Sequence, residues 1–167
     1  MAIETLSFDT ANGPTTAYVV TPDAPNGKAV ILIQEWWGLN EHIKDIARRY
    51  AAEGFTTIAP DLYRGKLATN PQEAGQMMAD LAIDDGIDTI GNAMKAATGK
   101  YGFEKYGITG YCMGGTYSLR ASCLLDGIAA AAPFYGDVPE EEVLKNLKAP
   151  TIFVSGTKDG WINPDKV

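Results

Sequence analysis

The feature that most constrains the fold of this chain is a glycine-rich turn between a strand-like run and a helix-like run. The turn reads Gly110-Tyr111-Cys112-Met113-Gly114-Gly115, with a strand predicted over residues 105–110 and a helix over 113–125. A nucleophile elbow has this layout, because its strained turn needs small neighbours that let backbone segments approach closely. Cys112 stands where serine is more common; the alternative is a buried structural cysteine. The glycine spacing excludes a dinucleotide-binding fingerprint and a phosphate loop.

Apolar periodicity predicts that strands and helices alternate along the chain. Residues 29–33 form a continuous apolar run, which is typical of a strand buried on both faces. Asn40 and Asn70 are predicted helix N-caps, and Pro71 suits a first helical position. The remaining predicted strands are 3–8, 15–21, 55–59, 128–134 and 150–155, and the remaining predicted helices are 85–98 and 140–147. This alternation predicts an α/β fold with a mostly parallel sheet and helices on both faces.

Composition narrows the possible partners and the compartment. A net charge of −7 argues against a nucleic-acid surface, which needs clustered Lys and Arg. No apolar run approaches the roughly 18 residues that span a bilayer, and the N-terminus lacks a signal pattern, so we expect a cytoplasmic protein. Cys112 and Cys123 would lie roughly 16 Å apart along a helix, too far for a disulfide. No cluster of ligating side chains has metal-site spacing, so neither a metal nor an organic cofactor is expected.

The loops that follow the predicted strands should meet at one edge of the sheet, where ligands bind in folds of this kind. These loops span residues 34–39, 60–66, 111–114, 135–137 and 156–163. At the start of its helix, Cys112 would experience the helix dipole, which favours a thiolate. The Met113 amide is placed to donate a hydrogen bond to an oxyanion, and the Trp36 amide is the best candidate for a second donor.

Five motifs, in this order, resemble the dienelactone hydrolase (carboxymethylenebutenolidase) family of the α/β-hydrolase superfamily, and the resemblance runs from about Ala29 to the end of the chain. They are 34–40 (QEWWGLN), 59–63 (APDLY), 110–115 (GYCMGG), 134–136 (FYG) and Gly156-x-x-Asp159. Members of this family open lactones or esters with a Cys-His-Asp triad. The resemblance implies Cys112 as nucleophile, Asp159 as the acid that orients the histidine, and Glu35 as a carboxylate that helps control the thiol's ionisation. The alternatives are a turn residue for Asp159 and an exposed loop charge for Glu35.

Aromatic residues near these motifs are candidates for a substrate pocket. Trp36 and Trp37 could wall an apolar pocket, although aromatic pairs more often fill a core. Tyr63 and Tyr135 are weaker candidates for the same pocket. The expected ligand is a small-molecule ester or lactone. Dienelactone itself is not expected, since residues 69–78, where the family's arginine should fall, contain no Arg or Lys.

The sequence departs from the family at the histidine. His42 is the only histidine, and we interpret it as a solvated helix residue rather than the base, because the base usually follows the acid in this fold. The chain stops eight residues after Asp159. We therefore expect residues 1–167 to be one α/β-hydrolase domain that is incomplete at its C-terminus, lacking a strand and a helix. The rival interpretation is a non-catalytic or inactive, truncated small-molecule binding protein. The oligomeric state is left open.

Overall fold

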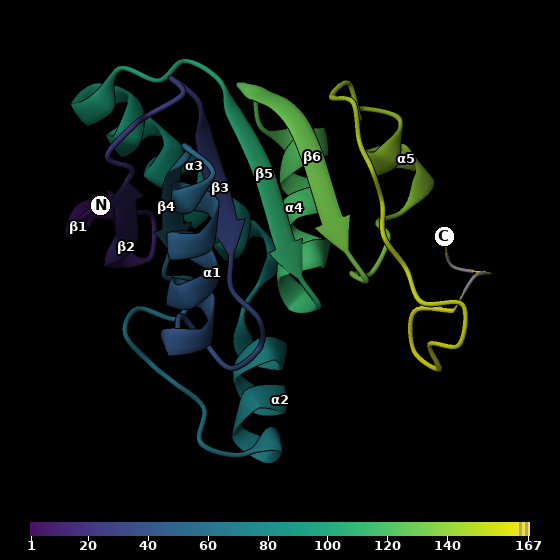
Figure 1. Cartoon of the computed structure of the whole chain (residues 1–167). Helices are drawn as coiled ribbons and strands as arrows, with labels where there is room; N and C mark the ends of the chain where they lie inside the picture. The colour runs from purple at the N-terminus through teal and green to yellow at the C-terminus, as the bar shows by residue number, and fades with distance from the viewer. Residues whose placement is uncertain (164, 166) are drawn as a thin grey trace.

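A six-stranded sheet in the order β1-β2-β4-β3-β5-β6 forms the centre of the part of the chain that the structure describes (Figure 1). This computed structural model describes residues 1–163, 165 and 167. The strands are β1 (Ala2–Thr10), β2 (Gly13–Thr21), β3 (Ala29–Ile33), β4 (Thr56–Pro60), β5 (Tyr106–Tyr111) and β6 (Ile128–Phe134). β3 to β6 pair in parallel and β1 and β2 pair antiparallel, which confirms the predicted mostly parallel sheet.

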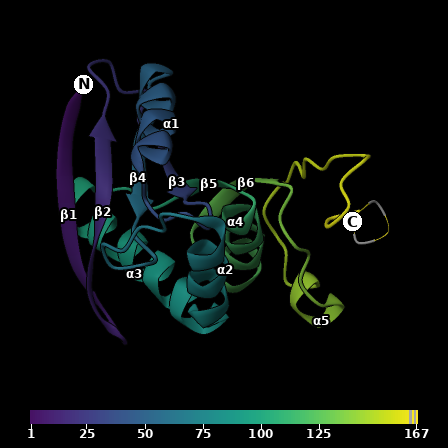
Figure 2. The same ribbon diagram turned by 90° about the horizontal axis from the view of Figure 1, so that it is seen from below.

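Helices cover both faces of this sheet, as predicted. They are α1 (Glu41–Ala52), α2 (Pro71–Asp80), α3 (Ile83–Tyr101), α4 (Met113–Leu124) and α5 (Glu141–Leu144). Figure 2 looks at the sheet edge-on, with α1 on one face and α3 and α4 on the other. Every residue of β3 and β4 is buried, because both strands lie between these two layers. The edge at the carboxyl ends of the parallel strands, next to α2, is the lower edge in Figure 1.

The predicted helix starts are confirmed by their capping bonds. The Asn40 side chain accepts the Ile43 amide at 3.1 Å, and the Asn70 side chain accepts the Glu73 amide at 2.9 Å. These bonds satisfy amides that have no partner inside the helix. α3 is longer than the predicted 85–98, and it ends where Gly102 adopts a left-handed φ of 79°.

Two predictions near the C-terminus are wrong in extent. The strand predicted over 150–155 is seen as two isolated parallel bridges, Ala131–Thr151 and Phe134–Val154. The segment follows β6, but no described strand pairs with its other side and Ile152 is 72% exposed, so a continuous ladder does not form. Of the helix predicted over 140–147, only α5 is α-helical. The residues after α5 form i→i+3 hydrogen bonds, which are typical of a tighter 3₁₀ turn.

One part of the sheet is uncovered on the α1 face. α1 packs on β2, β3 and β4, and Figure 1 shows β5 and β6 with no helix in front of them. An apolar cavity of about 390 Å³ lies on this face, between Tyr50 of α1 and Ile152. Ala130 of β6 is exposed here. No helix in the described part of the chain has the length and apolar character needed to cross a membrane.

Candidate active site

The turn between β5 and α4 has the backbone conformation of a strained elbow. Cys112 lies at φ 56° and ψ −118°, a region that non-glycine residues rarely adopt. A Cβ on Gly114 would lie 2.4 Å from the Ile33 carbonyl oxygen, and one on Gly115 would lie 2.3 Å from that of Phe134. The glycines are therefore required, because the first turn of α4 is pressed against the ends of β3 and β6.

The Cys112 thiol is half-buried and free of any disulfide. Burial raises its pKa above the ordinary value, and the carboxylates of Glu35 and Asp159 act in the same direction. The backbone amide of Met113 beside the sulfur opposes this shift. The fold thus gathers these three groups, from three separate loops, around the sulfur. Burial is the largest cause, and the net shift of the pKa favours a neutral thiol at rest.

Glu35 is half-buried at the carboxyl end of β3. Burial raises the pKa of its carboxyl group, and the neighbouring His42 partly opposes that shift. Both residues line a cavity of about 510 Å³ that runs beside α1 and is walled by Tyr50, Tyr111 and Tyr135. Sequence reasoning placed His42 on a helix surface and did not anticipate its proximity to Glu35.

The tryptophan loop is held by backbone contacts as well as by its rings. The Trp36 and Trp37 rings meet edge to face with centroids 5.5 Å apart. Trp36 packs against the larger core cluster, and Trp37 accepts the Ala68 amide through its carbonyl oxygen at 3.1 Å. Gly38, at φ 98°, leaves no room for a side chain beside the Lys66 carbonyl oxygen. Both residues are half-buried, and their place in a substrate pocket stays a prediction.

Asp159 is partly exposed, and it forms a local turn. One carboxylate oxygen, Oδ1, accepts the amides of Trp161 at 2.8 Å and Ile162 at 3.0 Å. This is the turn role foreseen as the alternative for Asp159. The same residue also influences the pKa of Cys112. One side chain therefore shapes the loop and contributes charge near the thiol.

The two tyrosines proposed as pocket residues have different environments. Tyr135 is 38% exposed and adopts a left-handed φ of 40°, which costs a non-glycine residue of order 1 kcal/mol or more. Its ring packs near those of Tyr111 and Phe134. Tyr63 is only 7% exposed, and its hydroxyl donates to the Met113 sulfur at 3.2 Å. Tyr135 therefore borders the open cavity, whereas Tyr63 lies in the core beneath the elbow.

Gln34 and Asp61 support the site and were not predicted as site residues. The Gln34 side chain is fully buried and accepts the Leu62 amide at 3.2 Å, while its Nε2 atom finds no partner among the described residues. Asp61 accepts the amides of Tyr63 at 3.0 Å and Gly65 at 2.7 Å. Their position in the sequence could have identified them, because Gln34 directly follows β3 and Asp61 directly follows β4 at the carboxyl edge of the sheet.

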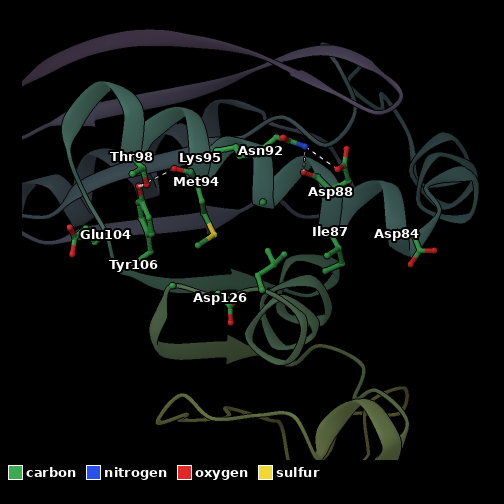
Figure 3. Close-up of a pocket in the computed structure, with 13 residues that line it drawn as sticks. Asp84, Ile87, Asp88, Asn92, Met94, Lys95, Thr98, Glu104, Tyr106 and Asp126 are labelled. Carbon is green, nitrogen blue, oxygen red and sulfur yellow. Dashed lines mark hydrogen bonds between the residues drawn. The ribbon is translucent and has the colours of Figure 1, made fainter.

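A second cavity, of about 560 Å³, lies away from the thiol (Figure 3). It runs along α3 and reaches Tyr106 and Gly127, which lie at the amino ends of β5 and β6. Figure 3 shows Asp84, Glu104 and Asp126 around it. None of the candidate residues lines it, so it does not belong to the elbow site. In the described part of the chain, no group of three or more His, Cys, Asp or Glu residues is arranged to hold a metal ion.

Comparison with known proteins agrees with this geometry. Residues 15–167 match the dienelactone hydrolase family. Protein usf of Aquifex pyrophilus is 40% identical over 162 residues, which cover 90% of this chain and 69% of that protein. A carboxymethylenebutenolidase homolog of Homo sapiens is 30% identical over 151 residues, which cover 86% of this chain and 60% of that protein.

Structural similarity extends over nearly the whole chain. A dienelactone hydrolase-like promiscuous phosphotriesterase from metagenomic libraries has a TM-score of 0.86 at 18% identity, covering 99% of this chain and 72% of that one. At this identity the likeness shows the α/β-hydrolase fold alone. The assignment to a family rests instead on the family match over residues 15–167 and on the sequence relatives. The chain belongs to the dienelactone hydrolase family of the α/β-hydrolase superfamily.

Proposed function

We propose that this hydrolase uses Cys112 as the nucleophile that cleaves ester or lactone bonds. The observation that carries the proposal is the elbow itself, where a half-buried thiol lies on a strained turn at the start of α4, next to the Met113 amide. A non-glycine residue is kept in such a conformation only when the surrounding structure enforces it, and this is common at functional sites. The carboxylates of Glu35 and Asp159 raise the pKa of this thiol, so the proposed nucleophile requires a base that removes its proton.

The reaction follows from these groups. The Cys112 sulfur, after losing its proton to a base, attacks the carbonyl carbon, and the carbonyl π electrons move to the oxygen. The Met113 and Trp36 amides stabilise that oxyanion, each contributing roughly 10²- to 10³-fold in rate. Collapse breaks the carbon–oxygen bond and releases the alcohol, which takes up a proton. Water then attacks the thioester, which releases the acid and restores the thiol.

We propose that the base is a histidine outside residues 1–167, oriented by Asp159 and carried by a segment that packs on this domain. Both turn bonds go to Oδ1 of Asp159, and Oδ2 is proposed to accept an imidazole N–H. The uncovered face of β5 and β6 supports such a segment, because a parallel sheet is normally covered on both faces. The same segment would complete the domain. A longer chain should therefore hydrolyse esters much faster than residues 1–167.

The proposed substrate is a small-molecule ester or lactone. The human relative is named for carboxymethylenebutenolide, a lactone, and we extend only the bond type to this chain. The cavity beside Glu35, with its tyrosine walls, is large enough for a small ester. A thiol nucleophile needs a reducing compartment, so we propose a cytoplasmic location.

A non-catalytic binding protein is the second candidate. It is favoured by one observation, that the single histidine of this sequence, His42, lies on α1 beside Glu35. Such a protein would retain the cavity and the thiol without turnover. It would bind esters and leave them intact.

Hydrolysis of p-nitrophenyl acetate by two matched variants separates these candidates. Cys112→Ala should abolish p-nitrophenolate release above the buffer rate. Cys123→Ala removes the other cysteine, which is buried in α4, and should leave the rate unchanged. The assay is run on residues 1–167 and on any longer natural chain. Equal rates for Cys112→Ala and the parent would show that the nucleophile assignment is wrong.

A further inference from the structure

We infer that Tyr63 and Gln34 are positioning residues that hold the Met113 and Trp36 amides at the separation an oxyanion requires. This inference rests on the proposed function, since it concerns the same two amides. Tyr63 belongs to the segment 61–65, which follows β4, and its hydroxyl bonds to Met113. Gln34 bonds to Leu62 of the same segment, so the segment is connected to both halves of the proposed oxyanion site. Tyr63 was expected in the substrate pocket, but its burial in the core suits a supporting role better.

The first connection joins the segment to α4. The Tyr63 hydroxyl donates to the Met113 sulfur at 3.2 Å, and both side chains are buried, at 7% and 4% exposed. Burial raises the pKa of Tyr63 well above its ordinary value, so the phenol stays protonated and keeps donating throughout the neutral range. Met113 is the first residue of α4, and fixing its side chain restricts how that first turn can move.

The second connection joins the segment to the loop after β3. The fully buried Gln34 accepts the Leu62 amide at 3.2 Å, and it lies two residues before Trp36. Without this acceptor the Leu62 amide would be buried without a partner, which costs roughly 1–3 kcal/mol. The Gln34 side chain therefore ties the start of the tryptophan loop to the segment that also holds Met113.

The segment itself is rigid enough to transmit position. Asp61 accepts the amides of Tyr63 and Gly65 through different oxygens, and the Thr15 hydroxyl donates to the Asp61 carbonyl oxygen at 2.8 Å. These bonds fix the turn against β2. The two amides lie on separate segments, and a displacement of about 1 Å in a catalytic group can cost roughly 10²-fold in rate.

The positioning effect is isolated by comparing two reactions of the Cys112 sulfur, acylation by p-nitrophenyl acetate and alkylation by iodoacetamide, as a ratio of their rates. With p-nitrophenyl acetate, the Cys112 thiolate forms a bond to the carbonyl carbon through an oxyanion, and the carbon–oxygen bond to p-nitrophenolate breaks. With iodoacetamide, the same thiolate displaces iodide and no oxyanion forms. Both reactions consume the thiolate, so the ratio of acylation to alkylation does not depend on the thiol pKa or on a base. Residues 1–167 carrying Cys123→Ala provide a single reactive cysteine.

Tyr63→Phe removes only the hydroxyl oxygen, and we expect acylation to fall about 10-fold while alkylation changes less than about 2-fold. Gln34→Met should lower the same ratio. Met113→Leu removes the sulfur acceptor, so the single variant should also lower the ratio of acylation to alkylation. The double variant Tyr63→Phe/Met113→Leu should show no further loss beyond that of Tyr63→Phe. Tyr101→Phe is the matched control, because its hydroxyl donates to Glu4 on β1, and its ratio should equal the parent's.

The outcomes separate the two proposals. An unchanged ratio in Tyr63→Phe, or equal losses in both reactions, overturns the positioning role. Independent, multiplying effects of Tyr63→Phe and Met113→Leu overturn it too. If the parent protein is not acetylated at Cys112 at all, the proposed function fails and this inference fails with it. Acetylation of Cys112 with an unresponsive Tyr63→Phe leaves the proposed function intact and rejects the inference alone.

Discussion

Gly114→Ala should damage both the stability of the fold and the chemistry of the elbow. The new Cβ would lie 2.4 Å from the Ile33 carbonyl oxygen and 2.7 Å from that of Gln34. To reach even 3.0 Å, the end of β3 and the start of α4 must separate by about 0.6 Å. Overpacking of this kind costs about 1–3 kcal/mol, partly offset by the higher helix propensity of Ala, about 1 kcal/mol. The same displacement moves the Trp36 amide away from Met113.

Two measurements follow from this geometry. We expect the melting temperature of Gly114→Ala to fall by up to roughly 8 °C and the acylation rate of Cys112 by p-nitrophenyl acetate to fall about 10- to 100-fold. Gly99→Ala is the control, because nothing lies within 4 Å of a Cβ at this exposed position in α3. It should stabilise the protein by about 0.5–1 kcal/mol and leave acylation unchanged. Parent-like melting and acylation in Gly114→Ala would refute the close-approach argument.

Three further predictions test single contacts. Glu35→Gln removes a carboxylate that raises the pKa of Cys112, so the pH profile of iodoacetamide alkylation should move to lower pH; a move to higher pH would contradict this. Arg64→Met should cost about 1–2 kcal/mol in urea unfolding at pH 7, because Arg64 binds both oxygens of Asp85 at 2.6 and 3.0 Å. Arg64 holds the pKa of Asp85 below its usual range, so the ionised carboxylate contributes its full stabilisation above about pH 4. The loss caused by Arg64→Met should shrink as the pH falls below about 4 and vanish only below the lowered pKa; a loss that does not shrink with falling pH would contradict this. Asn40→Ala should lower the unfolding free energy by about 1 kcal/mol, and an unchanged value would mean that the cap at the start of α1 contributes nothing.

The fold was predictable where local pattern and burial agree. The apolar run at 29–33 and the capping residues Asn40 and Asn70 give β3, α1 and α2 correctly. The segment 150–155 has the same apolar pattern, but a strand needs partners as well as composition, and only β6 is available among the described strands. Local sequence carries no information about that missing pairing.

The candidate site was predictable at the elbow and less so around it. The backbone approaches closely at Gly114 and Gly115 and leaves no room for a side chain, which explains the glycines that follow Cys112 in the sequence. The positions of His42 beside Glu35 and of Tyr63 beneath Met113 depend on how loops cross in space, which spacing along the chain does not encode. A tyrosine after a strand is equally compatible with a pocket wall and with a support, and burial decides between them.

The central claim, that Cys112 is the nucleophile, is tested most directly by finding which atom carries the acyl group. The parent protein is mixed briefly with p-nitrophenyl acetate near neutral pH, quenched in acid, digested and mapped by mass spectrometry. We predict an acetyl group on Cys112, with Cys123 unmodified, and no such adduct in Cys112→Ala. An acetyl group on another residue, with Cys112 left free, would contradict the account.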